Sequence, residues 1–221
     1  MRVIVTGAAG VLGSAVVDAF AARGDSVAAL VRLANPAARA GVRHIVSSDL
    51  AKPAAAVAAV GEAVGALGGV EALVHLVGAF AWVPVEQSSL DTWRDLYTTN
   101  VETTLNVVRA CLPLIADQGN IVCIGAASAQ PAAAGMAPYA AAKSGVARLV
   151  EALSAELRPR GIRVNAVLPA IIDTPRNRAD MPQANPKDWT SPAAIAEVIL
   201  FLTDERARAI NGASIPVTNN A

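Results

Sequence analysis

The sequence predicts an α/β fold, in which helices cover both faces of one doubly wound parallel sheet and form three layers. Short apolar runs alternate with longer helical patterns along the whole chain, which is the order typical of such a sheet. The 221 residues are 54% hydrophobic and 16% charged, so one large core can form. No linker or change of composition divides the chain, and residues 1–221 are therefore expected to form a single domain.

The first half of the chain alternates apolar strand-like runs with helical patterns. Gly24 and Gly68 follow two of the helical patterns, where glycine commonly ends a helix, and Ser89 is a suitable cap for the third. A polar-to-proline stretch at Ala34–Ala37 separates the second and third strands. In order, the expected elements are strand Val3–Val5, helix Ser14–Ala22, strand Val27–Val31, strand His44–Val46, helix Pro53–Leu67, strand Ala72–Val77 and helix Leu90–Ile115.

The second half continues the alternation. Ser191 and Pro192 begin its last helix, with serine at the cap and proline in the first turn. The segment from Pro169 to Trp189 has few periodic positions and is interpreted as a loop that acts as a lid. In order, the expected elements are strand Ile121–Ile124, helix Tyr139–Leu157, strand Arg163–Leu168, a helix ending near Leu202 and strand Ser214–Val217.

Charge and cysteine usage argue against several functional classes. Lysine plus arginine equal aspartate plus glutamate at 18 each, so we expect no nucleic-acid partner. No apolar run reaches the roughly 18–20 residues of a membrane span, and the strand pattern near Met1 leaves no room for a signal peptide. Cys111 and Cys123 lack metal or redox spacing. We therefore expect a cytoplasmic protein without a membrane partner or a metal.

A glycine-rich turn follows the first strand and contains Thr6, Gly7, Gly10, Leu12 and Gly13. Glycines let the backbone turn sharply and approach a pyrophosphate, and the following helix offers free N–H groups and the positive end of its dipole. A glycine-rich string alone also marks ordinary turns. Its place between a strand and a helix favours a dinucleotide site and a Rossmann-type fold.

Arg32 stands at the end of the second strand, where an acidic residue normally binds the adenosine ribose. An arginine there can pair with a 2′-phosphate, whereas a carboxylate would repel it. This predicts a preference for NADP(H), with NAD(H) as the other possible cofactor. The alternative interpretation is a solvated surface arginine.

Tyr139 and Lys143 are four residues apart, which places both side chains on one face of the expected helix. A lysine ammonium near a tyrosine lowers the pKa of the phenol and suits it to proton transfer near neutral pH. Together with the glycine turn, the pair makes the whole chain resemble the short-chain dehydrogenase/reductase family. The resemblance implies an NAD(P)-dependent oxidoreductase with a small-molecule substrate, in which Tyr139 and Lys143 are catalytic.

Further residues carry the same resemblance in chain order. It implies that Asn100 is catalytic and anchors a water that relays protons. It also implies that several other residues bind the cofactor. Two of them flank the adenine, two contact the nicotinamide end, and one lies in the segment after the fourth strand. These residues are Asp49, Leu50, Gly78, Pro169 and Thr174. Relatives commonly pair through two long helices, so the resemblance also implies a homodimer or a homotetramer.

The most consequential departure from the family pattern lies thirteen residues before Tyr139. The family serine that donates a hydrogen bond to the substrate oxygen is replaced by Ala126. Ser128 would substitute only if the loop were reshaped. His75 stands in a motif that is asparagine-rich in the family, and we interpret it as a local hydrogen-bonding residue rather than a base.

A narrower resemblance accounts for the missing serine. The segments Gly125-Ala126-Ala127, Gly135–Tyr139, Asp173–Arg178, Met181-Pro182 and Trp189-Thr190 resemble quinonoid dihydropteridine reductases, which also lack it. This implies hydride transfer to an activated acceptor, such as a quinonoid dihydropterin, an imine or a carbonyl. Two alternatives stay open: a carbonyl or 3-oxoacyl thioester reductase of the same family, and a dinucleotide-binding redox sensor with little catalysis.

Overall fold

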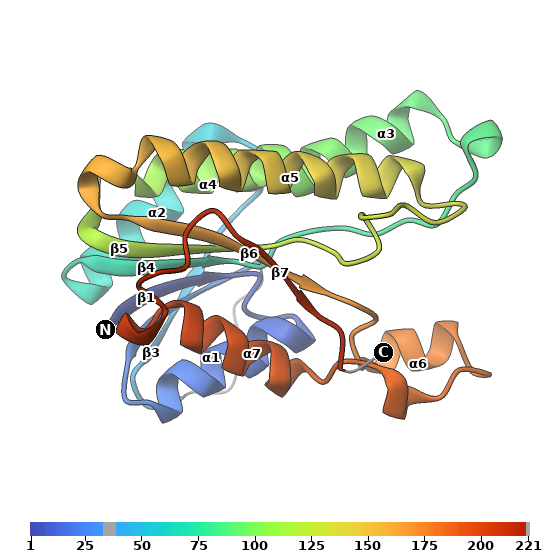
Figure 1. The fold of residues 1–221 in the computed structure, drawn as a ribbon. Helices are drawn as coiled ribbons and strands as arrows, with labels where there is room; N and C mark the ends of the chain where they lie inside the picture. Colours follow the sequence, from blue (N-terminus) through green and yellow to red (C-terminus); the bar gives the residue numbers. More distant parts are fainter. Residues whose placement is uncertain (33–38, 220–221) are drawn as a thin grey trace.

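The computed structural model describes residues 1–32 and 39–219, and its parallel sheet confirms the predicted doubly wound architecture. Seven strands stand in the order β3-β2-β1-β4-β5-β6-β7, and each neighbouring pair is parallel (Figure 1). The strands are β1 (Arg2–Thr6), β2 (Ser26–Val31), β3 (Val42–Val46), β4 (Val70–His75), β5 (Ile115–Ile124), β6 (Arg163–Pro169) and β7 (Ser214–Val217). The stretch Ala34–Ala37 lies outside the described residues.

Helices cover both faces of this sheet and form the outer two layers. Figure 1 shows α2, α3, α4 and α5 on one face and α1 and α7 on the other, while α6 lies beyond one edge. Four short 3₁₀ turns and one π-helical segment complete the described secondary structure. The helices are α1 (Val11–Ala22), α2 (Pro53–Leu67), α3 (Leu90–Tyr97), α4 (Thr103–Cys111), α5 (Ala137–Glu156), α6 (Pro175–Asp180) and α7 (Pro192–Leu202); the 3₁₀ turns are Val85–Gln87, Arg158–Arg160, Pro186–Asp188 and Glu205–Ala207.

Two apolar cores lie on opposite sides of the sheet because successive strand side chains point to opposite faces. In β1, Val3 and Val5 pack into the core beneath α1 and α7, whereas Ile4 packs into the core beneath α2, α4 and α5. Strands that are buried on both faces read as continuous apolar runs, which explains why the strand positions are visible in the sequence.

The prediction of one helix over Leu90–Ile115 is wrong. It is divided into α3, a π-helical segment (Thr98–Glu102) and α4, which ends at Cys111. The hydroxyls of Thr103 and Thr104 each donate to a backbone carbonyl four residues earlier at 2.6 Å, and such bonds compete with regular helix bonds. Ile115 instead begins β5 and pairs with Val70.

The segment Pro169–Trp189 is also more ordered than the predicted lid-like loop. Thr174 caps α6 through its Oγ1, which accepts a hydrogen bond from the Asn177 amide at 3.1 Å. Asn185 caps a 3₁₀ turn in the same way, and Ile172 forms a parallel bridge with Thr190. Local side-chain capping therefore orders a proline-rich stretch that has little apolar periodicity.

Candidate active site

The predicted cofactor and catalytic residues gather at the carboxyl ends of the strands. Thr6 ends β1 and His75 ends β4, and these neighbouring strands lie where the strand order reverses. In open α/β sheets, this reversal leaves a crevice in which ligands bind. The topology therefore places a binding crevice between the glycine turn and the segment that follows β4.

The glycine turn packs too closely for larger side chains. Gly7 has a φ of +66°, and a Cβ added there would lie 3.1 Å from the Leu76 carbonyl carbon. A Cβ on Gly13 would lie 2.7 Å from the Ala8 Cα, closer than real Cβ atoms approach. Gly10 caps α1 in an extended conformation, so a ligand can approach the first amides of that helix. This cradle fits the pyrophosphate of a dinucleotide.

A groove of about 610 Å³ runs along this turn. Gly10, Val11 and Ser14 line it from α1, while Ser191 and Pro192 line it from the start of α7. Leu12 is half-buried and packs against the core beneath α1 rather than facing the groove. The starts of two helices therefore border the space next to the turn.

His75 ties the turn to the π-helical segment through a chain of hydrogen bonds. Thr6 Oγ1 accepts from the Leu76 amide at 3.2 Å and lies 2.9 Å from His75 Nδ1. On the other ring edge, Thr103 Oγ1 lies 3.4 Å from His75 Nε2 and donates to the Thr99 carbonyl at 2.6 Å. Because the Thr103 hydroxyl already donates to the Thr99 carbonyl, its oxygen accepts from Nε2–H, and the Thr6 hydroxyl donates to Nδ1. The ring is therefore neutral and carries its proton on Nε2.

Burial and, to a smaller extent, the Lys143 charge together lower the pKa of His75 to about 3. The unfolded chain takes up this proton below about pH 6.5, whereas the folded protein resists it until about pH 3. Stability is therefore complete above about pH 6.5 and is lost as the pH falls. We expect His75 to account for roughly 3 kcal/mol of the stability lost between neutral pH and about pH 4.

This is tested by urea unfolding of His75→Asn at both pH values. The variant is expected to lose less stability than the wild type on acidification, because asparagine does not titrate. His44→Asn is the matched control, since His44 is the other histidine of the chain and lies on β3. An acid-induced loss in His75→Asn equal to that of the wild type would show that His75 does not carry this dependence.

Lys143 and Asn100 converge on Gly78. A Cβ on Gly78 would lie 2.7 Å from Asn100 Oδ1 and 3.0 Å from Lys143 Nζ. Lys143 is buried, and its Nζ donates to the Ile124 carbonyl at 3.0 Å. Burial lowers the pKa of Lys143 to about 8. The absence of a side chain at position 78 thus leaves room for both polar groups at one place.

Asn100 is engaged on both sides of its amide. Its Oδ1 accepts from the Ala79 amide at 3.2 Å, while its Nδ2 donates to the Ala79 carbonyl at 3.0 Å and to the Leu96 carbonyl at 2.8 Å. The residue lies in the π-helical segment, and such segments often mark functional sites. These contacts make Asn100 the side chain that positions the segment after β4.

Tyr139 lies in the first turn of α5, on the same helix face as Lys143. The expectation that Lys143 lowers the pKa of this phenol is wrong for this structure: burial raises it to about 12. The ammonium of Lys143 is directed to the Ile124 carbonyl, and loss of hydration disfavours the tyrosinate. The Tyr139 phenol therefore keeps its proton at neutral pH.

Ala126 is buried next to β5, and Ser128 is half-buried two residues later. The Ala127 amide donates to the Pro169 carbonyl at 2.9 Å and joins this loop to the end of β6. Asp49 is exposed and accepts from the Ala51 amide at 3.0 Å, while Leu50 is buried.

Arg32 and Thr174 lie at different sides of the crevice. Arg32 is exposed directly after β2, and Thr174 is occupied in capping α6. Pro169 is buried at the end of β6. The structure therefore gathers Gly78, Asn100, Tyr139 and Lys143 at one place, and it leaves the other predicted residues distributed along the carboxyl edge of the sheet.

Two residues of this region, Phe80 and Thr103, were not predicted from the sequence. Phe80 contacts Tyr139 edge to face, with ring centroids 4.9 Å apart and planes at 83°. Thr103 takes part in the hydrogen-bond chain of His75. An aromatic residue two positions after Gly78 was a visible signal for the first. The second depends on a contact between residues 28 apart and left no local signal.

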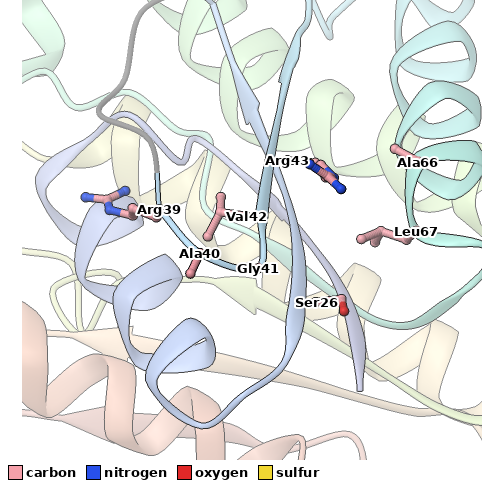
Figure 2. A pocket seen from close by; sticks show the side chains of 8 residues that line it. All are labelled: Ser26, Arg39, Ala40, Gly41, Val42, Arg43, Ala66 and Leu67. Carbon is pink, nitrogen blue, oxygen red and sulfur yellow. The ribbon is translucent and has the colours of Figure 1, made fainter.

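A second cavity, of about 310 Å³, lies at the opposite edge of the sheet (Figure 2). Ser26 and Val42 line it at the amino ends of β2 and β3. The Arg39 guanidinium pairs with Asp18 at 2.8 Å, and in Figure 2 it does not point toward Arg43. Its lining includes none of Gly78, Asn100, Tyr139 and Lys143.

The structure describes residues 1–32 and 39–219. In these ranges no helix is long and apolar enough to cross a membrane. Within the same described part of the chain, no group of three histidine, cysteine or acidic side chains is arranged to hold a metal ion. Cys111 and Cys123 are buried, and burial raises the pKa of each thiol to about 12.

The chain is similar in sequence and in fold to known proteins. Residues 1–185 match the family described as short chain dehydrogenase. A D-threitol dehydrogenase from Mycolicibacterium smegmatis is 29% identical over 233 aligned positions, which cover 97% of this chain and 90% of that protein. An uncharacterized oxidoreductase from Mycobacterium tuberculosis is 32% identical, with 65% of this chain matching 61% of that protein, which is less than two thirds of its length.

A solved structure matches the fold over its full length. It is a short chain dehydrogenase from Burkholderia cenocepacia in complex with NADP, 29% identical, with a TM-score of 0.90. The match covers 100% of this chain and 98% of that one.

Proposed function

The chain belongs to the short-chain dehydrogenase family and is an NAD(P)-dependent oxidoreductase, and on that premise we propose that Tyr139 donates the proton during reduction of an activated acceptor. The observation that carries the proposal is the convergence of Lys143 and Asn100 on Gly78, with Tyr139 on the same helix face as Lys143. The domain responsible spans residues 1–221.

The dinucleotide is held by residues along the carboxyl edge of the sheet. The turn containing Thr6, Gly7, Gly10, Leu12 and Gly13 receives the pyrophosphate. Lys143 binds the nicotinamide ribose, and Arg32 binds the 2′-phosphate, so NADP(H) is preferred and NAD(H) is accepted. NADP in the Burkholderia structure supports this preference. Asp49 and Leu50 flank the adenine, whereas Gly78, Pro169 and Thr174 border the nicotinamide end.

The bound cofactor supplies a hydride, and with it two electrons, to an electrophilic carbon of the acceptor. Tyr139 gives its phenolic proton to the acceptor oxygen or nitrogen that gains the electron pair, and solvent returns a proton to the tyrosinate. Asn100 holds the Ala79 backbone, and with it the route through which water restores the proton.

The acceptor is one that needs little help from an oxyanion donor. Ala126 offers no hydroxyl to a developing negative charge, and such a donor is worth about 10²–10³ in rate where it is present. A quinonoid dihydropterin, an imine or an activated carbonyl is already electrophilic. The resemblance to quinonoid dihydropteridine reductases supports this class.

A second candidate function is the interconversion of an ordinary alcohol and its carbonyl, including a 3-oxoacyl thioester. It is favoured by one observation, the likeness to a D-threitol dehydrogenase over nearly the whole chain. In that reaction Ser128 would have to take the place of the serine missing at position 126.

We also propose a homodimer or a homotetramer. Tyr97 of α3 and Leu105 of α4 expose apolar surface on the outer side of the helical layer. A second copy that packs on α3, α4 and α5 would bury it.

The test measures NADPH and NADH oxidation in parallel, with quinonoid dihydropterin and with a carbonyl panel. We expect the dihydropterin to be the better acceptor and NADPH the better donor. Arg32→Ala should weaken NADPH binding about 10- to 100-fold, because a charged hydrogen bond is lost, and should leave NADH binding unchanged. Arg43→Ala on β3 is the control. A wild-type preference for NADH would refute the Arg32 assignment, and a preference for simple ketones would favour the second candidate.

A further inference from the structure

The segment that leaves β4, residues 78–83, is attached at both of its ends. Near its start, Asn100 exchanges two hydrogen bonds with the Ala79 backbone, at 3.0 and 3.2 Å. At its end, the Val83 amide donates to the Gly135 carbonyl at 2.7 Å. This segment therefore joins the π-helical segment to the turn that leads into α5.

Trp82 strengthens the second attachment. Its indole Nε1 donates to the Ala134 carbonyl at 3.1 Å, and its ring lies directly against Gly135. A Cβ on Gly135 would lie 2.8 Å from Trp82 Cζ2, and Gly135 also has a φ of +76°. Only glycine meets both conditions without strain, so this position is shaped to receive the indole.

Phe80 lies between these attachments and against Tyr139. Its ring meets the phenol edge to face at 4.9 Å, yet 57% of the Phe80 side chain remains exposed. Trp82 is 61% exposed although its Nε1–H is bonded. Phe80 thus remains open to solvent against Tyr139, and Trp82 remains open to solvent against the turn that precedes α5. Their backbone is held in place, so this exposure is a fixed feature of the surface next to Tyr139.

We propose that Phe80 and Trp82 form an aromatic wall of the acceptor site, and that this wall selects flat conjugated acceptors over small aliphatic ones. Phe80 is the residue that determines this specificity, and Trp82 is a positioning residue that fixes it through Gly135. The inference rests on the proposed role of Tyr139. It adds an acceptor class that the family membership does not specify.

The chemistry of the wall accounts for the selectivity. An exposed aromatic face gains from stacking on another flat π-system and from the apolar area that both rings remove from water. A small aliphatic carbonyl offers neither a π-face nor comparable area.

The alternative occupant of this surface is a second copy of the chain. Val85 and Leu90, which follow the wall in sequence, are also exposed at 64% and 71%. A subunit interface that covered all four side chains would make Phe80 and Trp82 structural. Sedimentation of the variants separates the two explanations, since only the interface predicts dissociation.

The experiment compares reduction of phenanthrenequinone and diacetyl by NADPH in the wild type and in Phe80→Leu, Trp82→Ala and Trp82→Phe. Phe80→Leu is expected to lower kcat/KM for the quinone about tenfold, through a higher KM, and to leave the value for diacetyl within about twofold. Trp82→Ala should raise the KM for the quinone similarly, and Trp82→Phe should restore most of it. Val85→Ala is the matched control.

Two independent measurements keep the outcomes distinct. Calorimetric binding of phenanthrenequinone to the NADP⁺-loaded protein should weaken about tenfold in Phe80→Leu, whether or not turnover is observed. A wild type that binds the quinone but oxidises no NADPH would refute the proposed function alone. Equal effects of Phe80→Leu on both acceptors, unchanged quinone binding, or dissociation of the oligomer would overturn the aromatic wall.

Discussion

Tyr139→Phe is expected to lower the rate of reduction by about 10²–10⁴-fold, because the variant keeps the aromatic ring and loses the proton that Tyr139 donates. The phenol retains this proton across the neutral range, since burial raises the pKa of Tyr139 to about 12. The loss should appear in kcat, while binding of NADPH stays within about twofold of the wild type. Steady-state kinetics and a fluorescence titration with NADPH measure the two quantities separately.

The matched control is Tyr97→Phe, which removes the other tyrosine hydroxyl of the chain. Tyr97 is 51% exposed at the end of α3, so the variant should have wild-type kinetics. Because phenylalanine preserves the contact with Phe80, a folding defect is not expected in Tyr139→Phe. Turnover of a true substrate at the wild-type rate by Tyr139→Phe would refute the proposed mechanism.

The second large effect is expected for Gly13→Ala. The added methyl would lie 2.7 Å from the Ala8 Cα and 2.8 Å from the Gly7 carbonyl carbon, and both are backbone atoms that cannot turn away as a flexible side chain would. The turn must therefore open, which we expect to cost about 1–3 kcal/mol of stability and to weaken NADPH binding by at least about tenfold. Urea unfolding and the NADPH titration measure these two effects.

Gly61→Ala is the control for Gly13→Ala, and we expect it to change stability in the opposite direction. Gly61 is exposed in α2, and a Cβ there would meet nothing within 4 Å. Alanine is the better helix former, so this variant should gain about 0.5–1 kcal/mol and bind NADPH normally. Normal NADPH binding by a folded Gly13→Ala protein would show that the pyrophosphate does not use this turn.

The helices and strands that were predicted well from the sequence are those with strong local signals. Helix α2 runs from Pro53 to Leu67 and strand β7 from Ser214 to Val217, both as expected. Proline at the start and glycine after the end mark the boundaries of α2. The prediction of one long helix before β5 was wrong. The helix is divided where the hydroxyls of Thr103 and Thr104 bond to backbone carbonyls, and a residue pattern does not reveal these bonds.

The pKa of Tyr139 shows most clearly the difference between what residue spacing predicts and what the structure has. The four-residue spacing placed Tyr139 and Lys143 on one helix face, and the structure has them there. The same spacing suggested that Lys143 lowers the pKa of the phenol, whereas the pKa is raised. Burial of the phenol decides the direction, while the Lys143 ammonium is bonded to the Ile124 carbonyl of β5.

Residue patterns along the chain were enough to predict the architecture, the glycine turn and the residues at the ends of the strands, because these depend on local periodicity and on backbone freedom. Only the tertiary structure decided what surrounds each functional side chain. It joined His75 to Thr6 and Thr103, brought Gly78 between Asn100 and Lys143, and placed Phe80 against Tyr139. The physical reason is that burial and hydrogen bonding between distant residues set the pKa values and the shape of the site, and neither is encoded in local spacing.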